Sequence, residues 1–75
     1  MSTNPLNTLG EVVAEVMRQK GVSENRVALE SGISRQTLRR RLRGGGFIDN
    51  ELSAIGRILE LPASELMALA EKRAA

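Results

Sequence analysis

Arginines gathered in one short stretch carry the clearest chemical signal in this chain. Residues 34–43 hold five arginines and no acid, and three glycines follow at positions 44–46. A helix turns by roughly 100° per residue, so Leu38 and Leu42 share one face. The opposite side then presents Gln36, Arg39, Arg40 and Arg43. Guanidinium groups are always charged and offer a planar fork of N–H donors. The stretch therefore predicts a helix that binds a polyanion, and our leading hypothesis is a DNA recognition helix.

The composition removes the usual tools of catalysis. The chain has 75 residues, no cysteine and no histidine. Thiolate sites, the commonest metal ligand and the usual general base are therefore missing, although carboxylate chemistry stays open. We expect no enzyme, no metal site and no cofactor, and no small-molecule ligand is evident. A chain of this size makes one domain that buries roughly 60% of its unfolded surface.

The charge is unevenly distributed along the chain. Residues 31–48 carry five basic groups and no acid, whereas the other 57 residues carry six basic and nine acidic groups. This asymmetry indicates one positive face on a mildly acidic body. A solvated helix face is the plainer explanation of any charge run, but five arginines within nine positions favour a binding surface. The only aromatic residue is Phe47, and binders of single strands usually stack bases on aromatic rings, so duplex binding is favoured.

Apolar residues at helical spacing predict helices throughout, and no segment alternates as a strand does. The first predicted helix covers residues 8–20, where Thr8 and Glu11 have the spacing of a capping box. Gly21 then provides a stop. Residues 1–7 are polar and lack the pattern of a secretion signal, and we expect a flexible tail.

Two short helices are predicted in the middle of the chain, at residues 24–31 and 34–43. Ser23 and Ser34 stand at their N-caps. Gly32 ends the former with a positive φ, which glycine tolerates best. Because the connection is so short, the two helices should cross steeply.

The C-terminal part of the chain predicts two more helices. One starts near Asp49 or Asn50, either of which can cap it, and ends at Pro62. Gly56 inside it suggests a close helix contact. The last helix runs from Pro62 or residue 63 to about residue 72. In the loop before these helices, Phe47 and Ile48 are expected to enter the core.

Residues 24–43 resemble the helix-turn-helix of the lambda repressor and Cro (XRE-like) family. The resemblance depends on a small residue at the helix crossing, a glycine turn and apolar inner positions, namely Val27, Ala28, Gly32, Ile33 and Leu38. One helix precedes this motif and two follow, so the resemblance covers about residues 9–69. It implies an all-α fold, a compact bundle of five short helices forming a single helix-turn-helix DNA-binding domain over residues 8–73.

Three positions depart from the family pattern. Ser31 replaces a usually apolar residue, and Arg41 replaces a common inward aliphatic, whose packing Leu42 can take over. Arg41 then either contacts a flanking phosphate or lays its stem over the edge of the core. Glu24 replaces the glutamine that many members use near the DNA backbone.

The resemblance also implies which residues would meet DNA. Base edges in the major groove would be contacted by Ser34, Arg35, Gln36, Arg39 and Arg40. Arginine suits guanine and glutamine suits adenine. The sugar-phosphate backbone would be contacted by Thr37, Arg41, Arg43, Gly44 and Gly45. A wider rim of phosphate contacts could include Arg18, Lys20 and Arg26, although ordinary surface charge explains these three better.

These observations favour a sequence-specific double-stranded DNA-binding transcriptional regulator, cytoplasmic in a bacterial cell or phage-infected host. We expect a homodimer on a palindromic site, with Met67 or Phe47 near its interface, or a monomer that dimerises on DNA. No apolar run approaches the length of a membrane span. The alternatives are a protein-interaction module of the antitoxin or antirepressor kind, which would bind an acidic partner, and an excisionase-like factor that bends DNA.

Overall fold

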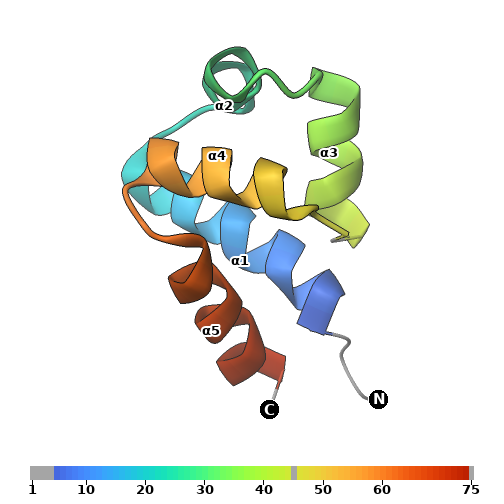
Figure 1. The fold of residues 1–75 in the computed structure, drawn as a ribbon, viewed down its shortest axis with the longest axis vertical. Coiled ribbons are helices and arrows are strands. Elements are labelled where there is room, and N and C mark those ends of the chain that lie inside the picture. The colour runs from blue at the N-terminus through green and yellow to red at the C-terminus, as the bar shows by residue number, and fades with distance from the viewer. Residues whose placement is uncertain (1–4, 45, 75) are drawn as a thin grey trace.

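A computed structural model describes residues 5–44 and 46–74, with only the backbone of residues 5–7. The described residues form five helices and no strand (Figure 1): α1 (Pro5–Lys20), α2 (Glu24–Ser31), α3 (Arg35–Gly44), α4 (Asp49–Leu59) and α5 (Ala63–Ala74). The predicted all-α bundle of five short helices is confirmed. No helix in the described part of the chain is long and apolar enough to cross a membrane.

Helix α1 is the element on which three of the other four described helices pack. It contacts α3, α4 and α5, and it lies across the middle of Figure 1. Its apolar stripe is buried as the spacing predicts: Leu9, Val12, Val13, Val16 and Met17 are all at most 6% exposed. The core forms where this stripe meets the inner faces of the other helices, since apolar area removed from water is the main driving force of folding.

The start of α1 differs from the prediction. The helix begins at Pro5, so residues 5–7 are helical although we expected them in the tail. Proline suits a first helical turn because its φ is already helical and its missing N–H has no partner there. Thr8 is consequently a buried residue inside the helix, and the predicted cap at Thr8 is wrong. Residues 1–4 of the predicted tail lie outside the described residues.

The N-terminus of α4 also differs. Ile48 is the N-cap residue, with φ −87° and ψ 161°, and neither Asp49 nor Asn50 caps the helix. Isoleucine has no side-chain acceptor, but its backbone N–H donates to Glu51 Oε1 at 3.2 Å. This is the returning half of a capping box.

Only one of the two apolar loop residues reaches the core. Phe47 packs against the core, whereas Ile48 is 55% exposed. Consecutive side chains on extended backbone point to opposite sides, so burial of Phe47 leaves Ile48 in solvent. The expectation that both would be buried is wrong for Ile48.

The close contact expected at Gly56 is present, but its partner is a loop. A Cβ atom at position 56 would lie 2.4 Å from the carbonyl oxygen of Leu61. The Leu61 N–H donates to the Gly56 carbonyl at 2.9 Å, and Glu60 between them has φ 60°. Glycine therefore lets the chain fold back tightly after α4.

Candidate nucleic-acid interface

The turn between α2 and α3 begins and ends at the capping residues that the sequence predicts. The Arg26 N–H donates to Ser23 Oγ at 3.1 Å, which starts α2. Gly32 has φ 78°, and its N–H donates to the Ala28 carbonyl at 3.0 Å, which ends the helix. Figure 1 shows α2 nearly end-on while α3 lies in the plane of the view, so the helices cross steeply. Val27 and Ala28 are buried on the inner side of α2.

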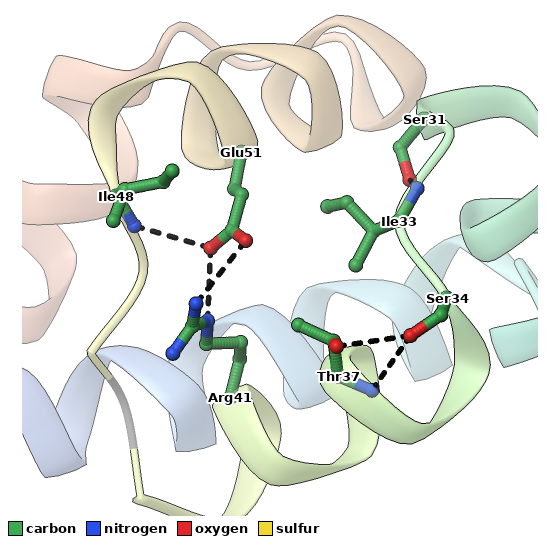
Figure 2. Close-up of polar contacts among 7 residues, drawn as sticks. All are labelled: Ser31, Ile33, Ser34, Thr37, Arg41, Ile48 and Glu51. Carbon is green, nitrogen blue, oxygen red and sulfur yellow. Dashed lines mark hydrogen bonds and ion pairs between the residues drawn. The ribbon is translucent and has the colours of Figure 1, made fainter.

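Two serine hydroxyls hold the turn between the helices (Figure 2). Ser31 Oγ accepts the Ile33 N–H at 3.2 Å, and Ser34 Oγ accepts the Thr37 N–H at 3.2 Å. The Ser34 hydroxyl also donates to Thr37 Oγ1 at 2.9 Å. Ser34 thus caps α3, as predicted. The role of Ser31 was missed, although a serine that bonds the backbone two residues on is a known turn device.

Apolar contacts fix the inner face of α3. Leu38 is fully buried, and Ile33 and Leu42 are partly buried against the same core. Helix α1 approaches so closely that a Cβ atom on Gly10 would lie 2.4 Å from the Leu42 carbonyl oxygen. This close approach was also missed, although Gly10 lies inside a predicted helix just as Gly56 does, and the same argument would have suggested it.

One ion pair ties the C-terminal half of α3 to the start of α4 (Figure 2). Arg41 Nε and Nη2 donate to the two carboxylate oxygens of Glu51 at 2.9 and 3.3 Å. The side chains are 25% and 13% exposed. Burial raises the pKa of Glu51, but hydrogen bonds from Arg41 and the Ile48 N–H outweigh it, so this pKa lies below its ordinary value. Bidentate geometry and partial burial make this pair stronger than a surface pair.

The outer side of α3 is a basic face. Arg35, Gln36, Arg39, Arg40 and Arg43 are all exposed. A shallow hollow of about 560 Å³, here called the α3 hollow, is lined by Gln36, Arg39, Arg40, Arg43 and Gly44. Of these arginines, Arg39 is paired with Glu24 of α2 at 3.2 Å. Among the described residues, no acid lies within ion-pair distance of Arg35, Arg40 or Arg43, the other exposed arginines of α3.

The remaining predicted contact residues lie around this face. Thr37 is half-buried and bonded to Ser34, and Gly44 is exposed at the end of α3. Gly45 lies outside the described residues. On the wider rim, Arg18 pairs with Glu15 and Arg26 pairs with Glu30, while Lys20 is exposed. Pairs of this exposed kind contribute little to stability.

The basic face of α3 can donate many hydrogen bonds and carries a high density of positive charge. No group of three or more acidic residues in the described ranges could hold a metal ion. The protein-family models contain no match to this chain, and no curated protein matches it either. The function is therefore inferred from α3 and the contacts that position it.

Proposed function

We propose that this protein is a sequence-specific double-stranded DNA-binding regulator of transcription, of the lambda repressor and Cro kind. Its α3 would enter the major groove. The observation that supports this most is the difference between the inner and outer sides of α3. Its inner side is fixed by the fully buried Leu38, and its outer side gathers a glutamine and three arginines around the α3 hollow.

The chemistry of the outer face matches the edges of base pairs. An α-helix fits the major groove, where arginine donates to guanine O6 and N7 and glutamine pairs with adenine N6 and N7. Arg35 and Gln36 stand in the first turn of α3, which is the part of a recognition helix that first meets the bases. Single-stranded nucleic acid is a poorer match, because its bases usually stack on exposed aromatic rings and the one aromatic ring, Phe47, packs against the core.

The supports of α3 favour recognition of sequence over loose attraction to charge. The α3 helix is capped by Ser34, packed through Leu38 and tied to α4 through Arg41 and Glu51. A binding face held on rigid elements keeps its donors in a fixed geometry. Base discrimination needs that geometry, whereas attraction to phosphates depends mainly on charge.

The test is a selection of bound duplexes from a random pool, followed by titration of the preferred duplex. Replacing Arg40 with alanine should weaken binding by about 1–3 kcal/mol and relax the preference at one position. Arg57, an exposed arginine on α4, provides the control, because Arg57→Ala removes the same charge outside α3. We expect it to leave the preference unchanged.

Two results would contradict the proposal. One is the absence of duplex binding at low salt, and the other is binding that does not weaken as salt rises. If the protein instead binds acidic polypeptides and shows no duplex binding, the interaction-module alternative is favoured. A selected duplex that is palindromic would support the expected homodimer, whose half-sites would lie about 34 Å apart.

A further inference from the structure

One arginine on the α3 face is held by an acid from another helix. Arg39 Nε donates to Glu24 Oε1 at 3.2 Å, and Glu24 is the first residue of α2. Both side chains are about half exposed, at 57% and 44%. Arg39 also lines the α3 hollow, so this contact lies at the edge of the proposed DNA-binding face.

The atoms used in this contact determine what remains free. A guanidinium group has five N–H donors, and the bond to Glu24 uses the one on Nε. The two terminal Nη groups keep their four donors, and this end of the guanidinium can approach guanine O6 and N7 together. A carboxylate on Nε therefore restricts the rotation of the guanidinium without occupying its base-contacting edge.

The same carboxylate opposes contact with phosphate. DNA phosphates are negative, so an acid beside Arg39 makes a loose phosphate contact at this position less favourable. Specificity is a difference of affinities, and a repulsive group that penalises the wrong mode of binding increases it. No comparable acid restrains Arg35, Arg40 or Arg43 within the described residues.

We propose that Glu24 is a positioning residue that determines sequence specificity. It would hold Arg39 through Nε so that the Nη groups contact a base, and it would keep Arg39 from binding phosphate instead. This inference depends on the proposed function, because it assigns a role within the same DNA-binding face.

A purely structural role for Glu24 has to be separated from this one. An acid in the first turn of a helix interacts favourably with the helix dipole, so Glu24→Gln can alter stability without any effect on recognition. Glu30→Gln is the matched control, because Glu30 is on the same helix and pairs with Arg26 at 2.9 Å. It removes the same charge and a similar exposed pair, but it leaves Arg39 untouched.

The experiment uses the full chain and the duplex selected by the wild-type protein. Kd is measured for that duplex, for each single base-pair substitution of it and for an unrelated duplex. Glu24→Gln should lower discrimination at one base pair by at least about fivefold and bind the unrelated duplex more tightly. Glu30→Gln should retain the discrimination. Arg39→Ala should lose discrimination at the same base pair, and adding Glu24→Gln to it should change nothing further there.

A second variant leaves α2 intact in case Glu24→Gln disturbs folding. Arg39→Lys keeps the charge, but its donors all lie on one nitrogen, so it lacks the planar fork that could be held at one edge while another edge contacts a base. It should lose the same discrimination and keep its affinity for the unrelated duplex.

Two results would overturn the inference. They are equal effects of Glu24→Gln and Glu30→Gln, and full discrimination by Arg39→Lys. If the wild-type protein binds no duplex at low salt, or binds duplexes with no preferred sequence, the proposed function itself fails, and the two failures are thereby distinguished.

Discussion

Replacing Gly10 with alanine tests how closely α1 and α3 approach. Alanine normally stabilises a helix interior by about 1 kcal/mol relative to glycine. At position 10, however, the new Cβ atom would lie 2.4 Å from the Leu42 carbonyl oxygen and 2.8 Å from that of Arg41. Both atoms belong to the backbone of α3, so no side chain can rotate away to relieve the contact.

The size of the effect follows from these distances. Ordinary van der Waals contact begins at 3.4 Å, so the Leu42 oxygen must retreat by about 1.0 Å from its 2.4 Å position. Overpacking that forces backbone shifts costs about 1–3 kcal/mol, occasionally more. A backbone shift of this size belongs at the upper end of that range, so subtracting the gain in helix propensity leaves an expected net loss of about 1–2 kcal/mol. For a domain of this size each kcal/mol lowers Tm by roughly 4–8 °C.

The assay is urea unfolding followed by circular dichroism, with Gly44→Ala as the control. Gly44 is also helical, but a Cβ atom there would have no neighbour within 4 Å, so this variant should be no less stable than the wild type. Because α3 carries the basic face, the proposed function implies that Gly10→Ala also weakens duplex binding. If Gly10→Ala is as stable as the wild type or more stable, the close approach of α1 and α3 is refuted.

Two further predictions concern stability alone. Glu51→Gln should destabilise the fold at neutral pH by about 1–3 kcal/mol, since it weakens the pair with Arg41. The pKa of Glu51 is lowered in the folded protein, so its stabilisation is complete above the unfolded-state pKa and is lost as pH falls through the folded-state value. The difference in the free energy of unfolding between Glu51→Gln and the wild type, measured with urea, should therefore disappear in acid. A difference that does not change with pH would contradict this assignment. Ser23→Ala should cost about 1 kcal/mol through loss of the α2 cap, whereas Ser53→Ala at an exposed position in α4 should cost less.

The fold was largely predictable because most of its helices carry local signals. The stripe from Leu9 to Met17 and the serine caps at positions 23 and 34 specify helices within a few residues of chain. Errors occurred where two signals competed. Thr8 has good capping chemistry, but Pro5 offers an earlier start. Asp49 could cap α4, but the helix starts instead at Ile48, whose backbone N–H donates a hydrogen bond to the Glu51 side chain.

The site was less predictable because its decisive contacts join residues far apart in the chain. Helical spacing places arginines on the outside of α3, and Leu38 is buried as that spacing requires. Neither the pair of Glu24 with Arg39 nor that of Arg41 with Glu51 follows from sequence spacing, since 15 and 10 residues separate the partners. Such pairs depend on how α2, α3 and α4 pack, which a periodic pattern in one helix does not determine.

Under the proposed function, the pair of Arg41 with Glu51 also limits how many DNA phosphates α3 would contact. The logarithm of the binding constant falls with the logarithm of salt concentration by about 0.9 per phosphate neutralised. If all five arginines of α3 met phosphates, the slope from this helix would be about −4.5. If Arg41 stays with Glu51, the slope from this helix is no steeper than about −3.6. Arg43 is exposed at the end of α3, whereas the Arg41 side chain is only 25% exposed.

Arg43→Gln should therefore make the slope shallower by about 0.9, while Arg41→Gln should leave it unchanged and lower stability instead. Both slopes have to be measured at a temperature where circular dichroism shows the variants folded, because Arg41→Gln leaves Glu51 half-buried without its partner. A slope that is shallower by the same amount in Arg41→Gln would mean that DNA draws Arg41 away from Glu51. In that case the phosphate contact predicted from the sequence is made, and binding loosens the attachment of α3 to α4.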